Sequence, residues 1–454
     1  MQFAGQRTDE NLNLIGEPFV TCVRLSDDIL PEPEAVLLTG ITPQQANDEG
    51  ITEPEFLRRF YEEVLQPDTC IMGYNTIRFD DEFMRFTLWR NFYDAYEWQW
   101  KDGRFRWDLI DVVRMTRALR PDGIVWPVDD SGKPINKLTD LTSSNGLDHE
   151  NAHDALSDVL ATIDMAKLLK DKQPKLFEYM FSKCQKRDVA AMINPEKPQP
   201  FVHTSGMLPP EFINTSVMLP LFADKKQSTK IVTYDLRYDP EQFVDLSVEE
   251  LRARLFTRRD ELGDVQRLPL KAVHTNKAPA IAPLGVLDEA TQQRIGISIE
   301  TIELHRNKLL RLKDLMAKLY DAWHTDQREF DDNPDVDASL YGGSFLGDAD
   351  KSTALEIRNA DQTTLTNYNP NFQDSRLTEL FFRYKARNFP SVLSEEEHIR
   401  WENYRREKLL VKGELQRYGE TLQKLIKEQT GKREIALIED LKLYAESIVP
   451  TDEN

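Results

Sequence analysis

Cysteine is scarce in this sequence. The 454 residues contain only Cys22, Cys70 and Cys184, which lie far apart. Because an odd number of dispersed cysteines cannot form a disulfide framework or a cysteine-type zinc site, a reducing compartment is indicated. The sequence also has no apolar run of roughly 18 residues or more, and its first residues lack the basic-then-apolar order of a signal peptide. We therefore expect a cytoplasmic protein without a membrane segment.

Positive charge is also in short supply. Lys and Arg number 58 against 78 Asp and Glu, which gives a net charge of −20. A global field of this sign does not attract nucleic acid, so nucleic-acid binding would need a local basic groove. Hydrophobic residues at 40% and charged residues at 30% are typical of a folded chain and exclude wholesale disorder.

The length of 454 residues exceeds what one hydrophobic core usually serves, so more than one domain is expected. We predict domains at residues 1–172, 173–325 and 326–454. In the first domain, short apolar runs alternate with helical patterns, which is typical of an α/β sheet. The second reads as mixed and mainly β, and the third as helical, with Ser394 and Glu397 forming a capping box at the start of a long helix.

One group of polar residues follows an apolar segment of the first domain, in GYNTIRFDDEF (73–83). The strand-like run ends at Tyr74, Asn75 follows, and Asp80 lies where a helix would begin. Strand-end geometry would place Asn75 and Asp80 at the sheet edge where α/β proteins usually have their sites. The alternative is that Asp80, Asp81 and Glu82 only complement the helix N-terminus.

A second group lies in NAHDALSDVLATIDMAKLL (151–169). Helical periodicity aligns Asp158 with apolar side chains, and a buried carboxylate is normally paired or bound to a metal ion. His153 lies just ahead of this helix, and its ordinary pKa suits a general base near neutral pH. The alternative is that Asp154 is a helix N-cap and His153 a surface residue.

Together these two segments resemble the second and third motifs of the DEDD superfamily of 3′-to-5′ exonucleases. Further stretches are similar to the bacterial exodeoxyribonuclease I family along essentially the whole chain: LLTGITPQQA (37–46), RNFYDAYEWQW (90–100), RWDLIDVVR (106–114) and LFFRYKARNFP (380–390). The resemblance implies a ribonuclease H-like exonuclease domain, an SH3-like domain and a helical C-terminal domain, arranged as a C around single-stranded DNA. It also implies a monomeric hydrolase that releases 5′-mononucleotides from 3′ ends in DNA repair and recombination.

The same resemblance implies a site with two Mg²⁺ ions. On the matching positions, His153 would take a proton from the attacking water, Asp158 would ligate metal, and Asp80 would complete the acidic cluster. Contacts with the DNA strand would come from Arg85, Tyr96, Trp100, Arg114, Lys137 and Tyr179. The acidic tail of single-strand binding protein would dock at Arg120, less strongly here because Asp288 falls where the family can be basic.

One departure from the family affects the chemistry. The family's first motif, Asp-x-Glu on the opening strand, is missing together with that strand, since the sequence matches the family only from just after it. Asp9 and Glu10 are adjacent and look like turn residues, so we do not transfer the metal role to them. We expect either a true start further upstream, which we favour, or a chain that is inactive as given.

Aromatic and basic residues are interleaved between Trp89 and Trp107. Bases stack on aromatic faces without regard to sequence, and cations follow the backbone of the strand, so an acidic protein could hold DNA in this way. We expect about half of these rings to belong to the core instead, Phe92 and Trp107 among them.

Basic residues in the later domains are further candidates for DNA contact. In the middle segment, charge for a phosphate-facing wall is offered by Lys225, Lys226 and Lys230, by the cluster from Arg252 to Arg259, and by Lys271, His274 and Lys277. The alternative for any one of these clusters is a solvated face. In the last domain, Arg383, Lys385 and Arg387 could serve DNA binding or helix packing equally.

Two other functions stay open. An exoribonuclease of the same superfamily is disfavoured, because relatives such as ribonuclease T are short single domains. A single-stranded DNA-binding protein that has lost catalysis is supported by the missing first motif and opposed by the retained His153 and Asp158.

Overall fold

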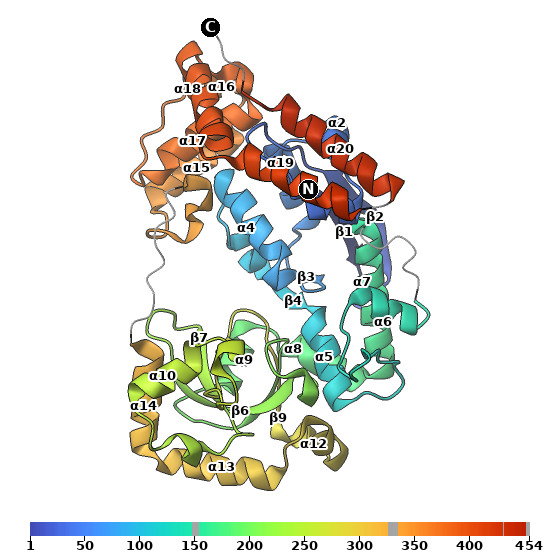
Figure 1. The fold of residues 1–454 in the computed structure, drawn as a ribbon, viewed down its shortest axis with the longest axis vertical. Helices are drawn as coiled ribbons and strands as arrows, with labels where there is room; N and C mark the ends of the chain where they lie inside the picture. The colour runs from blue at the N-terminus through green and yellow to red at the C-terminus, as the bar shows by residue number, and fades with distance from the viewer. Residues whose placement is uncertain (148–153, 326–334, 430, 451–454) are drawn as a thin grey trace.

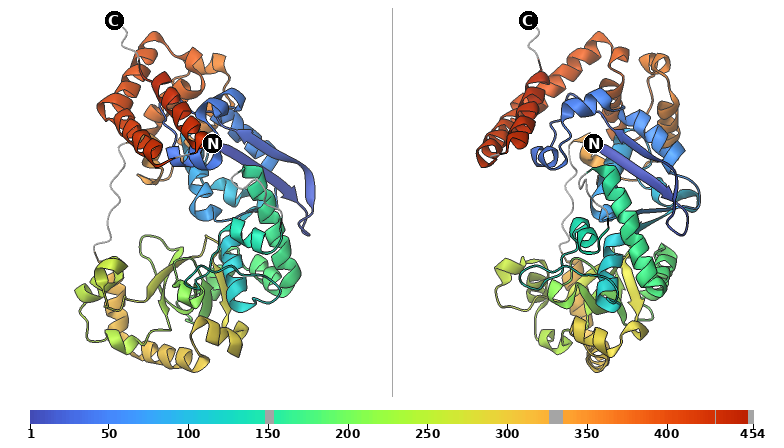
Figure 2. Two further views of the ribbon diagram at one scale, coloured as in Figure 1. Left: turned by 45° about the vertical axis from the view of Figure 1, so that its right-hand side comes forward. Right: turned by 90° about the vertical axis from the view of Figure 1, so that its right-hand side faces the viewer.

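A computed structural model describes residues 1–147, 154–325, 335–429 and 431–450 of the chain. Figure 1 shows three parts in an arc: an N-terminal part (blue to green), a middle part (yellow-green) and a C-terminal helical part (orange to red). The middle and C-terminal parts lie at opposite ends of the N-terminal part, and the turned views of Figure 2 show the same order. The expected α/β, mainly β and helical parts are therefore confirmed.

The strands of the N-terminal part form two small sheets. β1 (Gln2–Thr8) pairs antiparallel with β2 (Leu14–Cys22), and β3 (Cys70–Gly73) pairs in parallel with β4 (Phe105–Asp108). Among the described residues the two pairs are not joined by a further strand. Both sheets contribute to one hydrophobic core, because Phe3 of β1, Phe19 of β2 and Ile71 of β3 pack into the same cluster.

Helices surround these sheets. α4 follows β3 and α5 follows β4, as parallel strand–helix units require. The helices of this part are α1 (Pro33–Thr39), α2 (Pro43–Glu49), α3 (Glu53–Arg59), α4 (Asp80–Arg90), α5 (Leu109–Leu119), α6 (Leu138–Ser144), α7 (Ala155–Lys172), α8 (Pro174–Ser182) and α9 (Lys186–Met192).

The middle part is built on a five-stranded antiparallel sheet in the order β8-β7-β6-β5-β9. Its strands are β5 (Phe201–Thr204), β6 (Thr215–Ala223), β7 (Lys230–Asp235), β8 (Leu270–His274) and β9 (Ala280–Pro283). Its helices are α10 (Val248–Phe256), α11 (Arg259–Leu262), α12 (Glu289–Ile295), α13 (Ile299–Arg311) and α14 (Lys313–His324). Trp107 and Val112 of the N-terminal part share one buried cluster with Val202 and Val217 of this sheet, so the two parts are packed together.

The C-terminal part consists of helices. They are η8 (Val336–Tyr341), α15 (Asp348–Asn359), α16 (Gln362–Asn367), α17 (Arg376–Asn388), η9 (Pro390–Val392), α18 (Glu395–Arg406), η10 (Glu407–Val411), α19 (Glu414–Glu428) and α20 (Lys432–Ser447). The capping box that opens α18 is confirmed, since the Ser394 side chain accepts from the Glu397 N–H and the Glu397 side chain accepts from the Ser394 N–H.

Buried charge attaches the C-terminal helices to the N-terminal part. Asp28 is fully buried and accepts hydrogen bonds from Arg387 Nη2 at 2.7 Å and Lys408 Nζ at 3.1 Å. Arg383 and Lys385 are buried as well, and both are held in ion pairs. Of the two roles considered for this basic cluster, helix packing is the one that its contacts support.

No helix within the described residues is long and apolar enough to cross a membrane.

Candidate functional site

The loop after β3 presents Asp80. Asn75 follows the strand in the left-handed region at φ 64°, and the 3₁₀ turn η2 (Thr76–Arg78) leads into α4. Asp108, at the end of β4, accepts hydrogen bonds from the backbone N–H groups of Asn75 at 2.7 Å and Ile77 at 3.1 Å. Burial raises the pKa of Asp108 to about 6, although these N–H groups favour its charged form. The ends of the two parallel strands therefore fix the start of α4 together.

The adjacent carboxylates Asp80 and Asp81 are placed very differently. Asp81 is buried and pairs with the Arg106 guanidinium, which also donates to the Ile71 carbonyl at 2.7 Å. Asp80 is the first residue of α4 and lies exposed at the surface, although neighbouring atoms still partly desolvate its carboxyl group. Asp81 is thus part of the scaffold, while Asp80 is free to meet a ligand.

Asp158, the second candidate carboxylate, belongs to α7. It lies in the first turn of that helix and is half-buried. Desolvation raises the pKa of Asp80, and the negative charges of Asp81 and Asp158 raise it further. The negative charge of Asp158 therefore acts on Asp80, which links the two sequence motifs electrostatically.

The start of α7 is anchored by local contacts. Asp154 is the N-cap and accepts from the Ser157 N–H at 3.1 Å, as the N-cap alternative predicted. Gln2 of β1 donates to Asp154 Oδ1 at 3.2 Å and accepts from the Ala155 N–H at 3.1 Å. His153, the predicted general base, lies outside the described residues.

Asp80 and Asp158 supply only part of a metal shell. Carboxylate oxygens are the ligands that Mg²⁺ prefers. Because the negative charges of Asp80 and Asp158 repel each other, binding of a cation by both would be favourable. The described residues contain no group of three or more His, Cys, Asp or Glu side chains able to hold a metal ion. Asp9 and Glu10 lie in the turn between β1 and β2, as predicted. The Asp9 carboxylate accepts hydrogen bonds from the Asn13 backbone N–H at 2.8 Å and from the Asn13 side-chain amide at 2.9 Å.

Among the predicted DNA-contact residues, the aromatic ones remain accessible. Trp100 is 61% exposed. Tyr96 is half-buried, with the Arg85 guanidinium 5.7 Å from its ring centroid. Tyr179 is half-buried too, and desolvation raises its pKa to about 12.

The predicted basic contacts differ in how freely they can meet phosphate. Lys137 is exposed just before α6. Arg114 is bound to Asp111 at 2.7 Å. Arg85 is buried and pairs with Glu82, so its charge is already partly compensated within the protein.

The rings between Trp89 and Trp107 divide as expected. Buried members are Trp89, Phe92, Trp98 and Trp107. Phe92 packs against helices of the C-terminal part, where its ring lies 5.5 Å from that of Tyr384. About half of this aromatic cluster is therefore core, including both rings predicted to be so.

Sequence reasoning missed three side chains beside Asp80. Arg78 is exposed and reaches Ser205 Oγ at 3.3 Å, and Phe79 and Phe83 are also exposed. All three belong to the motif GYNTIRFDDEF (73–83). Their place in this motif, at the predicted start of a helix, was the sequence signal that could have identified them.

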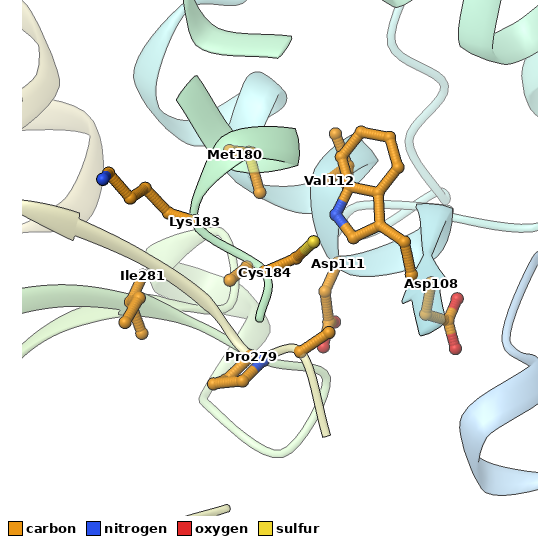
Figure 3. A pocket seen from close by; sticks show the side chains of 11 residues that line it. Asp108, Asp111, Val112, Met180, Lys183, Cys184, Pro279 and Ile281 are labelled. Atoms are coloured by element: carbon orange, nitrogen blue, oxygen red, sulfur yellow. The ribbon is translucent and has the colours of Figure 1, made fainter. Parts of the chain in front are cut away.

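A small pocket lies where the N-terminal and middle parts meet (Figure 3). Asp108 and Asp111 come from the N-terminal part, and Pro279 and Ile281 from the segment around β9. Asp80 and Asp158 do not line it. This pocket is therefore separate from the carboxylate pair.

Family models match nearly the whole chain. One described as "Exonuclease" matches residues 1–166, an exonuclease I SH3-like domain matches 184–325, and an exonuclease I C-terminal domain matches 334–448.

Related proteins match over similar lengths. The chain is 43% identical over 410 residues to exodeoxyribonuclease I of Haemophilus influenzae, covering 90% of this chain and 86% of that protein. It is 41% identical over 449 residues to exodeoxyribonuclease I of Escherichia coli, covering 99% of this chain and 94% of that protein.

Solved structures share the fold. E. coli exonuclease I in complex with a dA16 oligonucleotide has a TM-score of 0.94 at 41% identity, covering 99% of this chain and 95% of that one. The zinc-bound form of the E. coli ExoI–ssDNA complex has a TM-score of 0.93 at 40% identity, with the same coverage. An ExoI/SSB-Ct complex has a TM-score of 0.90 at 39% identity, again with the same coverage. The chain belongs to the exodeoxyribonuclease I family.

Proposed function

We propose that this protein degrades single-stranded DNA from the 3′ end and releases 5′-mononucleotides, in DNA repair and recombination. The observations that support the proposal are the position of Asp80 at the start of α4, after β3, and the negative charge of Asp158 of α7, which acts on it. The family, whose E. coli member is solved with oligonucleotides, supports single-stranded DNA as the substrate.

The proposed reaction is metal-dependent, with two Mg²⁺ ions. Asp158 and Asp80 would hold them, and the zinc-bound form of the E. coli ExoI–ssDNA complex supports binding of a divalent ion in this family. When bound, such ions polarise the phosphate and lower the pKa of a bound water. His153 would act as the general base that accepts a proton from the attacking water, since its ordinary pKa lies close to neutrality.

We infer that two further carboxylates are needed, on a strand that β1 and β3 could receive. Each of these strands pairs with one neighbour among the described residues, so each retains an edge for a second partner. β1 itself carries no acidic residue. A strand bearing Asp-x-Glu between them would bring its carboxylates toward Asp80 and Asp158, which would complete an acidic cluster.

The proposed path of the DNA strand uses the predicted contacts. These are Arg85, Tyr96, Trp100, Arg114, Lys137 and Tyr179. Trp100 and Lys137 are the most accessible of them. To bind a phosphate, Arg85 would have to give up its ion pair with Glu82, and Arg114 its ion pair with Asp111. We also retain domain boundaries at 172/173 and 325/326, and a cytoplasmic location, as proposals.

A second partner is the acidic tail of single-strand binding protein, which the ExoI/SSB-Ct complex of a relative supports. We propose Arg120 as a contact. Its guanidinium lies 3.6 Å from Asp288 Oδ2, so the tail carboxylate would have to compete with a residue of this chain.

The second candidate function is binding of single-stranded DNA without hydrolysis. It is favoured because this chain offers two candidate metal-binding carboxylates, Asp80 and Asp158, where the family uses a larger acidic cluster.

The test compares the chain as given with the chain preceded by an Asp-x-Glu strand, on 5′-labelled DNA and RNA oligonucleotides with Mg²⁺ and with EDTA. Mononucleotide release from DNA by the extended chain in Mg²⁺ supports the exonuclease. Binding without any gain in release supports the binding protein, and preferential release from RNA supports an exoribonuclease.

A further inference from the structure

The loop between β3 and α4, which leads to Asp80, is held by hydrogen bonds at five consecutive residues. In chain order, Tyr74 Oη donates to the Asn136 carbonyl at 2.6 Å, the Asn75 N–H to Asp108 Oδ1 at 2.7 Å, Arg106 Nη2 to Thr76 Oγ1 at 3.0 Å, the Ile77 N–H to Asp108 Oδ2 at 3.1 Å, and Arg78 Nη2 to Ser205 Oγ at 3.3 Å. A loop fixed at so many points presents the side chains that follow it in one geometry.

The backbone of this loop turns sharply. Asn75 has a φ of 64°, in the left-handed region that residues other than glycine adopt at a cost. A Cβ atom at Gly73 would lie 2.2 Å from Thr76 Cγ2, so the start of the turn has room only for glycine. A backbone of this kind persists only where its surroundings hold it in place. Two of the hydrogen bonds that do so come from the single side chain of Asp108.

Two charged side chains of β4, Arg106 and Asp108, hold the loop. They are two residues apart in a strand, so both point to the same face of the sheet. Arg106 binds Thr76 and also donates to the Ile71 carbonyl of β3 at 2.7 Å. Asp108 is buried, and hydrogen bonds from backbone N–H groups to a carboxylate are stronger than those between neutral groups. The strand next to β3 therefore sets the shape of the loop that follows β3.

We propose that Asp108 is a positioning residue for the reaction, because its hydrogen bonds from the Asn75 and Ile77 N–H groups set where the Asp80 carboxylate lies. This inference rests on the proposed function, in which Asp80 holds a metal ion, and adds to it a residue that acts only through the loop. Groups that take part in a reaction must lie within roughly 0.5 Å of their productive positions. A looser loop would therefore lower the rate of the chemical step and leave the binding of DNA unchanged.

Asp108→Asn separates the loop contact from a second role of this side chain. Asp108 is also the N-cap of α5, where its Oδ1 accepts from the Ile110 N–H at 3.2 Å. Asparagine caps helices about as well as aspartate does, and its carbonyl oxygen keeps the Oδ1 contacts with Asn75 and Ile110. Its NH₂ group then replaces Oδ2 and meets the Ile77 N–H, donor against donor. The substitution therefore removes the Ile77 contact and retains the cap.

Asp350→Asn provides a matched control. Asp350 is likewise buried and accepts two backbone N–H groups, that of Gln373 on Oδ1 at 2.8 Å and that of Asp374 on Oδ2 at 3.0 Å. It belongs to α15 of the C-terminal part, so its hydrogen bonds do not hold the loop before Asp80. The control therefore loses the same kind of hydrogen bond without moving Asp80.

Three measurements test the proposal on the chain preceded by an Asp-x-Glu strand. They are hydrogen exchange of the backbone amides, the Kd for a single-stranded oligonucleotide in EDTA, and kcat and KM for nucleotide release in Mg²⁺. In Asp108→Asn we expect faster exchange at Ile77, wild-type exchange at Ile110 and an unchanged Kd. The kcat should fall about 10- to 100-fold, the upper figure being the loss that a misplacement of about 1 Å can cause. Asp350→Asn should keep the wild-type kcat.

Several results would overturn the positioning role. These are an unchanged kcat in Asp108→Asn, an equal loss of kcat in Asp350→Asn, and a raised KM with kcat intact, which would indicate a role in holding DNA. Unchanged exchange at Ile77 would overturn the loop contact itself, whether or not the protein is active. Absence of nucleotide release by the unsubstituted extended chain would instead overturn the proposed function.

Discussion

Asp80 and Asp81 should respond in opposite ways to the same substitution. Asp81→Asn removes the charge that holds the buried Arg106 guanidinium, and it also affects Gln99, which donates to Asp81 at 3.3 Å. Asp80→Asn removes an exposed charge that is repelled by Asp158. The first change should destabilise the start of α4, and the second should leave the fold intact.

The magnitudes follow from burial. Breaking a buried ion pair by removing one partner costs about 3 to 5 kcal/mol. Because Asn keeps one acceptor oxygen for Arg106, we expect about 3 kcal/mol for Asp81→Asn, at the lower end of that range. For Asp80→Asn the expected change is within about 0.5 kcal/mol, as for other exposed substitutions.

Native-state hydrogen exchange of the α4 amides measures this local free energy directly. Nucleotide release by the chain extended with an Asp-x-Glu strand gives the second readout. We expect Asp80→Asn to exchange as wild type does and to lose activity. Equal protection of α4 in the two variants, or greater loss in Asp80→Asn, would refute the division of roles between the two carboxylates.

Three further predictions concern other parts of the molecule. Trp100→Ala should weaken single-stranded DNA binding about 5- to 100-fold without changing unfolding, because the ring is exposed; an unaltered Kd by anisotropy would remove Trp100 from the DNA path. Asp288→Ala should strengthen binding of an acidic tail peptide about two- to five-fold by freeing Arg120, a surface pair being worth up to about 1 kcal/mol; calorimetry showing no gain would exclude Arg120 as a contact. Asp28→Asn should lower stability to urea by about 3 kcal/mol at neutral pH. Although Asp28 is buried, Arg387 and Lys408 hold its pKa well below the usual range, so this stabilisation is present above about pH 4 and is lost as the pH falls further; a wild-type-to-variant gap that stays constant in acid would contradict it.

Local patterns predicted the parts of this molecule that depend on neighbours in sequence. The alternation of apolar runs and helices gave an α/β N-terminal part, and the residues after β3 and at the start of α7 gave Asp80 and Asp158. The N-cap of α7 at Asp154 and the capping box at Ser394 were readable for the same reason, since a cap involves residues within one turn.

Long-range contacts could not be read in this way. The pair of Asp28 and Arg387 joins residues 359 positions apart, and nothing near Asp28 in the sequence indicates its burial. The same limit applies to Arg85, where periodicity does not reveal that Glu82 compensates its charge. The shared core of Trp107 and Val202 likewise depends on how two parts of the chain pack.

The central claim is that Asp80 and Asp158 form part of one hydrolytic site for single-stranded DNA. Its most direct test measures mononucleotides released from a 3′-labelled oligonucleotide in Mg²⁺ by the chain extended with an Asp-x-Glu strand, alongside its Asp158→Asn variant. The account predicts rapid release by the extended chain and at least a hundred-fold loss in the variant, of the order seen when a group that acts in the transition state is removed, with DNA binding retained. Release that survives Asp158→Asn unchanged would contradict it.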